Sequence, residues 1–437
     1  MKVLLVNFTD VGGGAAIACF RLAESLNKNG VEATMAVVEK KSASPFVVEI
    51  PKTKKSKLCV LFVRIVNLFM RMARKLFPRV VAAASFRTSN PILHSTGKKS
   101  LVDVNWINSF DCDVVNLHWI GFDMLSVKDI AKIKKPIVWT MHDTWPFCGA
   151  EHYPNVLEND FRYTQEYTRK NKPKTTRGPD VCRSTWELKR KYLSQKEMFF
   201  ISPSNWEREE IQKSSLFSKK PCVTIPNIIP HSVFNVKEKK DIRRVLNIPD
   251  DKIVLGFGAA YDIDNPKGIK GSFLLLKALQ ELKNPEKYFF VVFGNVTEKF
   301  ASKISIPFFS AGFISNENIL ALLYNACDVF ICPSLVENLP NTCLESIFCG
   351  VPVVAFNSGG TSDIVVHKET GFLATPFNTK ELADGVEWCS EHFAELSKNC
   401  VEKSVRDFDE NKILNSYVSV YETLIKNANF CEKTYAL

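Results

Sequence analysis

The chain has 437 residues, more than a single hydrophobic core usually serves, so two domains of roughly 200 residues each are expected. Apolar residues make up 46% of the chain and charged residues 24%, which excludes a disordered, collagenous or coiled-coil protein. The thirteen cysteines are too sparse for a disulfide scaffold, and no C-x-x-C pair occurs, so reduced thiols are expected. The chain opens on an apolar run without a signal-peptide pattern, which favours a cytoplasmic protein.

The net charge of +10 is unevenly distributed, because residues 52–79 hold nine Lys or Arg residues and no Asp or Glu. Large apolar side chains are interleaved with these cations, and Arg64, Arg71 and Arg74 make the segment too charged to span a bilayer. A basic amphipathic segment suits an anionic membrane surface, and the same pattern also fits a packed helix with its cations in solvent. Nucleic acid is a weaker alternative, since no nucleic-acid-binding motif accompanies the basic residues.

The first half of the chain alternates between predicted strands and helices. Residues 3–6 are typical of a buried parallel strand, residues 15–29 are predicted to be helical, and Gly30 lies where a helix usually ends. Further strands are predicted at residues 31–38, 113–117, 136–140 and 198–202. This alternation favours a parallel α/β sheet with helices on both faces. Residues 150–190 are polar and irregular and are interpreted as a long insertion loop.

The same alternation restarts after the proline-bracketed residues 226–230. Strands are predicted at residues 252–257, 288–293, 309–313, 329–332 and 351–355, with an amphipathic helix at 272–282. The sequence therefore predicts two doubly wound domains, residues 1–225 and 241–408, joined by a linker at 226–240 and followed by residues 409–437. Two such sheets place the carboxyl ends of their strands around one cleft, where ligands bind. That arrangement fits a nucleotide-dependent transferase, a dehydrogenase or a binding protein.

Two glutamates after a predicted strand carry the most specific signal. Glu337 lies in a loop, and a helix capped by Asn341 or Thr342 is predicted to run to about residue 349, with Glu345 one turn inside it. Carboxylates are good acceptors for paired sugar hydroxyls, and the helix N-terminus favours an anionic group between them. Taken alone, the two glutamates fit a structural explanation equally well. Glu337 would then be a solvated loop residue, and Glu345 would form a local side-chain pair on its helix.

Two histidines each follow a predicted strand at its carboxyl end, and therefore at the cleft. His118 ends the strand at 113–117, His142 follows the strand at 136–140, and Asp143 is suited to orient a histidine ring. A single histidine in such a place is more often structural, but the pair favours a role in the cleft. The glycine run at 12–14 fits close approach to a phosphate or sugar, and it also fits a tight turn.

The spacing of Glu337 and Glu345 resembles the E-x7-E signature of the retaining nucleotide-sugar glycosyltransferases of family 4, which have the GT-B fold. Further matches extend the resemblance over nearly the whole chain and lie at residues 202–204, 225–227, 270–271, 350–355, 359–365, 370–373 and 407–424. By this resemblance residues 1–225 bind the acceptor, residues 241–408 bind the nucleotide sugar, and residues 409–437 form a helix that packs back on the first domain.

The resemblance also implies roles for individual residues. Glu345 would hold the ribose hydroxyls, Glu337 the transferred sugar and Lys270 the diphosphate, so His142, Glu337 and Lys270 are the implied catalytic residues. The implied donor-binding residues are Gly13, Gly14, Lys267, Lys270, Phe313, Ile314, Glu337, Asn338, Leu339, Asn341, Thr342 and Glu345. The implied acceptor-side residues are His118, Asp143, Trp145 and His152. The chain departs from the family at residues 258–260, Gly-Ala-Ala, where many members carry an arginine, and Lys267 is the expected substitute.

We therefore expect a cytoplasmic, metal-independent, retaining glycosyltransferase without a cofactor. It would act at the inner face of the membrane on a lipid-linked saccharide acceptor, in surface polysaccharide or O-antigen assembly. A transferase with a soluble acceptor, and a sugar- or nucleotide-binding protein without catalysis, are the alternatives. A dehydrogenase is disfavoured, because no dinucleotide fingerprint follows the first strand. No cluster with metal-ligand spacing is present in the sequence, so no metal site is predicted.

Overall fold

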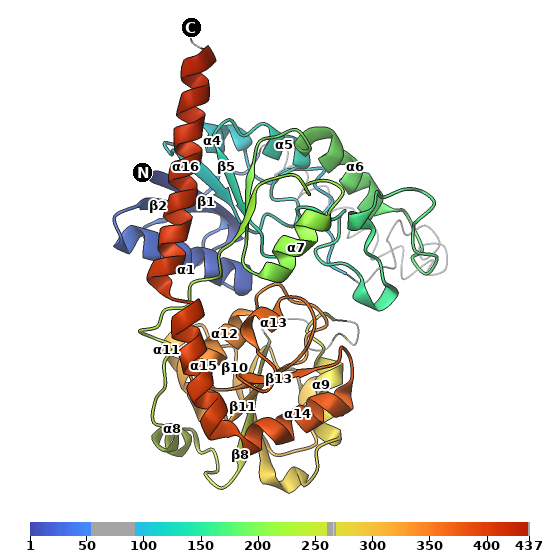
Figure 1. Cartoon of the computed structure of the whole chain (residues 1–437), viewed down its shortest axis with the longest axis vertical. Coiled ribbons are helices and arrows are strands. Elements are labelled where there is room, and N and C mark those ends of the chain that lie inside the picture. Colours follow the sequence, from blue (N-terminus) through green and yellow to red (C-terminus); the bar gives the residue numbers. More distant parts are fainter. Residues whose placement is uncertain (54–91, 260–264, 266–267, 436–437) are drawn as a thin grey trace, which may run out of the picture.

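The structure, a computed structural model, describes residues 1–53, 92–259, 265 and 268–435, and side chains up to residue 427. It shows two α/β domains, one above the other along the long axis of the molecule (Figure 1). The predicted fold class is therefore confirmed. Most of the basic segment at 52–79 lies outside the described residues, as does Lys267.

Within the described residues, the N-terminal domain contains a seven-stranded parallel sheet with the order β3-β2-β1-β4-β5-β6-β7. Its strands are β1 (Lys2–Thr9), β2 (Glu32–Glu39), β3 (Val47–Glu49), β4 (Val114–Leu117), β5 (Ile137–Thr140), β6 (Phe199–Ser202) and β7 (Cys222–Thr224). Its helices are α1 (Gly14–Lys28), α4 (Val104–Ser109), α5 (Val127–Ala131), α6 (Val181–Leu193) and α7 (Asn205–Lys213), with 3₁₀ turns η1 (Val156–Glu158) and η2 (Arg162–Thr164). Strands β4 and β5 are buried throughout, which explains why they appear in the sequence as short continuous apolar runs.

The C-terminal domain contains a parallel sheet of six strands among the residues described, with the order β10-β9-β8-β11-β12-β13. Its strands are β8 (Ile253–Ala259), β9 (Tyr288–Gly294), β10 (Phe308–Gly312), β11 (Val329–Cys332), β12 (Val353–Phe356) and β13 (Gly371–Ala374). Its helices are α8 (Lys239–Leu246), α9 (Ser272–Gln280), α10 (Glu298–Ala301), α11 (Glu317–Ala326), α12 (Asn341–Phe348), α13 (Thr361–Ile364), α14 (Thr379–Glu391) and α15 (Phe393–Asp407), with the 3₁₀ turn η3 (Pro285–Lys287). Both sheets have the strand order of a doubly wound fold, in which ligands bind beyond the carboxyl ends of the strands.

The last helix, α16 (Glu410–Tyr435), leaves the C-terminal domain and runs along the N-terminal one (Figure 1). The buried Tyr421 lies against β4, and its hydroxyl accepts a hydrogen bond of 2.7 Å from the amide of Asn116. At the start of the helix, Ser25 of α1 donates a hydrogen bond to Glu410 over 3.0 Å. The chain therefore crosses between the domains twice, once before α8 and once between α15 and α16.

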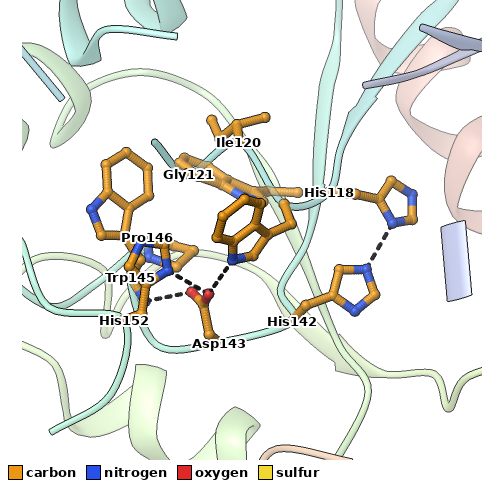
Figure 2. Close-up of a pocket in the computed structure, with 10 residues that line it drawn as sticks. His118, Ile120, Gly121, His142, Asp143, Trp145, Pro146 and His152 are labelled. Carbon is orange, nitrogen blue, oxygen red and sulfur yellow. Dashed lines mark hydrogen bonds and ion pairs between the residues drawn. The ribbon is translucent and has the colours of Figure 1, made fainter. Parts of the chain in front are cut away.

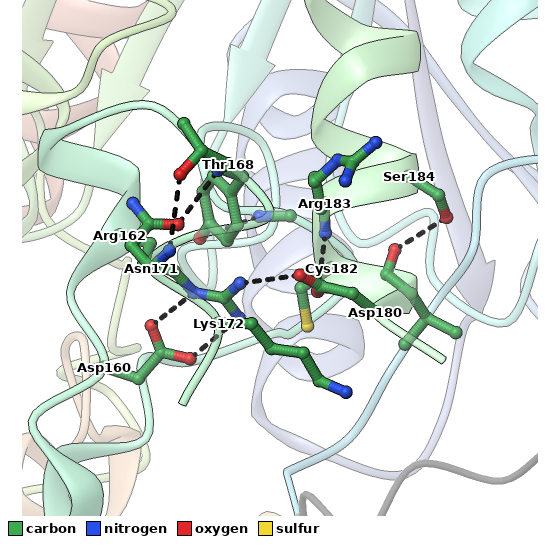
Figure 3. Close-up of polar contacts among 12 residues, drawn as sticks. Asp160, Arg162, Thr168, Asn171, Lys172, Asp180, Cys182, Arg183 and Ser184 are labelled. Atoms are coloured by element: carbon green, nitrogen blue, oxygen red, sulfur yellow. Dashed lines mark hydrogen bonds and ion pairs between the residues drawn. The ribbon is translucent and has the colours of Figure 1, made fainter. Parts of the chain in front are cut away.

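Residues 150–180 are irregular, as predicted, and their only helical or strand elements are the 3₁₀ turns η1 and η2, whereas residues 181–190 belong to α6. Arg162 is buried and forms ion pairs with Asp160 over 2.8 Å and with Asp180 over 3.0 Å (Figure 3). Asp180 also caps α6 by accepting from the main-chain N–H of Arg183. Charged residues of this irregular segment are thus paired with one another and fix it against the start of α6.

Candidate active site

The N-termini of two helices from different domains meet between the sheets. Helix α1 begins at Gly14 after Gly13, whose φ of 90° favours glycine. Helix α12 begins at Asn341, and the side-chain amide of Asn341 donates to the main-chain carbonyl of Gly14 over 3.1 Å. Each helix N-terminus offers main-chain N–H groups and the positive end of its dipole, so an anionic group is favoured where they meet.

The predicted cap of α12 was wrong. Pro340 occupies the N-cap position, and no side chain caps the helix. The side chain of Asn341 instead lies between the domains, where its oxygen accepts from Asn227 over 2.8 Å. Thr342 is half-buried in the first turn.

Glu337 lies in the loop before α12, paired with the predicted diphosphate-binding lysine. Its Oε1 accepts from Lys270 Nζ over 2.6 Å and from the Ser334 hydroxyl over 2.9 Å, and the residue is 8% exposed. Lys270 is placed by Gly271, which has a φ of 63° and passes so close to the carbonyl of Pro333 that a Cβ would clash with it. The structure thus brings these two predicted site residues, Glu337 and Lys270, together as an ion pair.

Glu345 is almost fully buried, and its partners come from both domains. Its Oε1 pairs with Arg21 Nη2 of α1 over 2.8 Å, and its Oε2 accepts from the Tyr324 hydroxyl of α11 over 2.9 Å. Burial raises the pKa of Glu345, and Arg21 opposes this increase. The carboxylate is therefore held by one cation and one hydroxyl.

Asn338 follows Glu337, and its side chain connects the domains. Its amide donates to the carbonyl of Met141 over 3.1 Å and to Glu207 Oε2 over 2.6 Å, and its oxygen accepts from the Ser204 hydroxyl over 2.6 Å. Burial raises the pKa of Glu207 well above its ordinary value. Because both N–H groups of its side-chain amide are occupied in this way, Asn338 has no side-chain N–H left to donate to a ligand.

His118 and His142 lie at the carboxyl ends of β4 and β5 and contact each other. His118 Nδ1 lies 2.9 Å from His142 Nε2, and their rings are stacked. Among the described residues, the buried His118 Nε2 has no hydrogen-bond partner. A buried acceptor without a partner is less costly than a buried donor without one, so we assign the shared proton to His118 Nδ1. His142 Nε2 then accepts, and the His142 proton lies on Nδ1.

Both rings are neutral at physiological pH. Burial lowers the pKa of His142 to about 4, and burial together with His142 lowers the pKa of His118. His142 is therefore a neutral hydrogen-bonding group, with His118 fixing its tautomer.

Beside the histidine pair, Asp143 holds a second set of side chains (Figure 2). Its Oδ2 accepts from the Trp119 indole over 2.6 Å and lies 2.6 Å from His152 Nδ1, whose Nε2 lies 2.7 Å from the Ser95 hydroxyl. Asp143 thus orients His152 and Trp119 rather than His142. A small cavity is lined by members of both sets and their neighbours: His118, Trp119, Ile120, Gly121, Trp139, His142, Asp143, Trp145, Pro146 and His152.

Trp145 and His152 are buried in the N-terminal domain. The Trp145 indole donates to the carbonyl of Ser95 over 2.9 Å, and the residue is 2% exposed. The buried ammonium of Lys189 donates to the carbonyls of Trp145, Cys148 and Gly149 and fixes their loop. In contrast to these buried side chains, Phe122 is exposed, and its ring packs against that of Trp119.

The remaining predicted donor residues lie around the C-terminal sheet. Phe313 is 51% exposed in the loop between β10 and α11, whereas Ile314 beside it packs on the core. Leu339 is buried in the loop before α12.

Sequence reasoning missed Arg21, Glu207 and Trp119. Arg21 carried a usable signal, since it is a charged residue among the apolar positions of a predicted helix. The contacts of Glu207 and Arg21 could not be predicted, because their partners come from the other domain.

Two further features concern only the described part of the chain. There, no group of three or more His, Cys, Asp or Glu side chains is arranged to hold a metal ion. No helix described is both long and apolar enough to cross a membrane.

Two family profiles cover most of the chain. Residues 12–233 match Glycosyltransferase Family 4, and residues 238–406 match Glycosyl transferases group 1. A curated relative from Campylobacter jejuni, N,N'-diacetylbacillosaminyl-diphospho-undecaprenol alpha-1,3-N-acetylgalactosaminyltransferase, is 28% identical over 261 residues. That match covers 56% of this chain and 65% of the relative, a little under two thirds of its length.

Solved structures resemble the whole chain in fold. Anabaena Alr3699/HepE in complex with UDP and glucose has a TM-score of 0.62 and 16% identity, covering 97% of this chain and 100% of that one. Sucrose-phosphate synthase from Thermosynechococcus elongatus has a TM-score of 0.64 and 16% identity, covering 98% of this chain and 99% of that one.

Proposed function

Because the chain belongs to glycosyltransferase family 4 and has the GT-B fold, we propose that it transfers a sugar from a nucleoside diphosphate sugar to a hydroxyl of a lipid-linked saccharide, with retention of the anomeric configuration. One observation carries the proposal. Glu337, which pairs with Lys270, lies in the loop that leads into α12, and the N-terminus of α12 meets that of α1. This arrangement combines an acceptor for sugar hydroxyls with positive charge for a diphosphate.

The donor diphosphate would lie between the two helix N-termini, with Lys270 beside it. Negative charge develops on the leaving diphosphate as the glycosidic bond breaks, and fixed positive charge stabilises that transition state. Lys270 and the helix N–H groups supply this charge from the protein itself, so we propose that no divalent metal is required.

Glu337 and His142 would hold the transferred sugar. Glu337 already accepts from Lys270 and Ser334, so it is suited to accept sugar hydroxyls rather than to remove the acceptor proton. His142, with its proton on Nδ1, would donate a hydrogen bond to the sugar. On this proposal the leaving phosphate takes the acceptor proton while the acceptor hydroxyl attacks from the same face.

A lipid-linked acceptor is supported by the name of the Campylobacter relative and by the basic segment at 52–79. We propose that this segment brings the enzyme to the inner face of the cell membrane, where surface polysaccharides such as O-antigen are assembled. Residues 1–225 would bind the acceptor and residues 241–408 the donor.

A thermal-shift panel of nucleoside diphosphate sugars tests the donor class, because a ligand that binds the folded state stabilises it. The donor found is then offered with a polyprenyl-diphosphate-linked saccharide and with the same saccharide free in solution, with and without EDTA. We expect transfer to the lipid-linked acceptor, in EDTA as well, with an unchanged anomeric configuration by NMR. Transfer to the free saccharide alone would favour the soluble-acceptor alternative, and binding without transfer would favour a non-catalytic protein.

A further inference from the structure

Arg21 of the N-terminal domain reaches into the donor half of the site. Its Nη2 lies 2.8 Å from Glu345 Oε1 and 2.8 Å from Glu317 Oε1, and its Nε donates to the same Glu317 oxygen over 2.9 Å. The guanidinium also lies over the ring of Phe234, 5.1 Å from its centroid, and Arg21 is 4% exposed. A long cationic side chain is therefore buried against the second glutamate of the E-x7-E signature.

One end of this guanidinium has no acceptor. Within the part of the chain that the structure describes, Arg21 Nη1 is buried without a hydrogen-bond partner. Leaving buried N–H groups of a charged side chain unpaired is costly, so such a group marks a place where a ligand atom belongs. Glu345 also has capacity to spare, since each of its oxygens has one partner and could accept another hydrogen bond.

The charge of this cluster selects the ligand chemistry. Arg21 carries one positive charge and faces the carboxylates of Glu317 and Glu345, so the cluster as a whole is negative. A phosphate is disfavoured there, whereas neutral hydroxyl groups can donate to the carboxylate and accept from the guanidinium. Glu345 lies four residues into α12, about 6 Å along the helix from the N-terminus at which we place the diphosphate. The next unit of a nucleoside diphosphate after its phosphates is the ribose.

We propose that Arg21 is a donor-binding residue, and that it recognises the ribose together with Glu345. The two ribose hydroxyls donate to Glu345, and Arg21 Nη1 donates to a hydroxyl oxygen. This inference rests on the proposed function, because it requires a nucleoside diphosphate donor. It adds that the N-terminal domain contributes to nucleotide recognition, so the ribose site is complete only when the two domains are in contact.

The test is calorimetric binding of UDP, GDP and ADP, followed by the 2′-deoxy and 3′-deoxy analogues of the nucleotide that binds most tightly. The variants are Arg21→Met and Arg21→Lys. Ser25→Ala is the matched control, since Ser25 lies one turn further along α1 and loses only its contact with Glu410. We expect wild type to bind at least one deoxy analogue 10-fold or more weakly than the parent nucleotide, a loss of the size that one charged hydrogen bond gives.

Arg21→Met should weaken binding of the parent nucleotide by a similar factor and bind that deoxy analogue about as well as wild type does. Arg21→Lys should lose most of the discrimination, because lysine lacks the guanidinium fork, and Ser25→Ala should keep it. Each ratio of ribo- to deoxynucleotide affinity comes from one preparation, so partial unfolding does not change it. If Arg21→Met loses fold in thermal unfolding, the comparison is repeated with Arg21→Met/Glu345→Met, which removes both buried charges and should also fail to discriminate.

Equal losses for parent and deoxy nucleotides in Arg21→Met would overturn the inference, as would a variant that still discriminates. Wild-type binding of both the 2′-deoxy and the 3′-deoxy analogue as tight as that of the parent nucleotide would also overturn it. Failure of the wild type to bind any nucleoside diphosphate would instead overturn the proposed function on which it rests.

Discussion

The amide of Asn338 donates a hydrogen bond of 3.1 Å to the main-chain carbonyl of Met141, in the other domain. Met141 precedes His142, and Asn338 follows Glu337. A single side chain therefore ties the strand end that carries the histidine to the loop that carries the glutamate. The relative position of the two groups proposed to hold the transferred sugar depends on this contact.

Asn338→Ala should lower turnover at least 10-fold and destabilise the fold. The substitution leaves Ser204 and Glu207 without their buried partner, which costs about 1–3 kcal/mol. Sugar transfer and thermal unfolding measure the two effects. Asp363→Ala is the control, because it removes a more exposed contact between the same domains, to the main-chain N–H of Asn205. Equal effects from both variants would show that Asn338 only holds the domains together.

Lys270→Met should lower the turnover number about 100-fold or more, because it removes a fixed cation from the developing charge of the leaving group. It also leaves Glu337 without its ion pair. Lys277→Met is the matched control, since Lys277 lies on α9 and its side chain is 65% exposed. Single-turnover transfer distinguishes chemistry from binding. A Lys270→Met enzyme with unchanged turnover and only a raised KM for the donor would assign Lys270 to ground-state binding.

His142→Asn should lower turnover more than donor affinity, and it should change how stability depends on pH. The pKa of His142 in the folded protein is about 4, below that of an unfolded histidine near 6.5, so below about pH 6.5 the unfolded chain binds a proton that the folded chain does not. Wild-type stability therefore falls as the pH drops from about 6.5 to 4, by up to about 1.4 kcal/mol per pH unit for this group.

Urea unfolding at pH 7, 6 and 5 measures this acid dependence. The fall in stability with falling pH should be shallower in His142→Asn than in wild type. The control His231→Asn should show the same fall as wild type, since His231 is exposed. A variant as acid-sensitive as the wild type would mean that the pKa of His142 is not lowered in the folded protein. Because the folded ring stays neutral, the activity of wild type should show no loss near pH 6.5 from protonation of this residue.

Replacing Arg64, Arg71, Arg74 and Lys75 by Gln should weaken binding to anionic vesicles and leave transfer to a short soluble acceptor unchanged. Each cation near a charged membrane contributes about 1 kcal/mol at most, and less as salt rises. Co-sedimentation with anionic and neutral vesicles at low and high salt checks this. Binding that is independent of lipid charge, of salt and of these four residues would contradict the proposed membrane contact.

The alternation of strands and helices could be predicted because buried parallel strands are short, continuous apolar runs, as in β4 and β11. The E-x7-E spacing likewise identified Glu337 and Glu345 as candidates. The irregular segment before α6 could also be predicted, but the burial of Arg162 and Lys189 could not, because it depends on specific partners that composition does not reveal. Arg21, Asn338 and Glu207 depend on contacts between residues more than 130 positions apart in the chain. Such contacts follow from how two domains meet, and no local pattern encodes them.

The path of α16 constrains how the protein can be divided and how it can move. A fragment that ends near residue 225 would leave Asn116 without the hydroxyl of Tyr421 and would uncover the surface on which the buried Tyr417 and Tyr421 pack. The first domain is therefore built from both ends of the chain and is not a separable N-terminal piece. Two covalent connections between the domains also resist twisting of one against the other. We therefore expect any relative motion of the two domains to be mainly a rotation about the axis that joins these two connections.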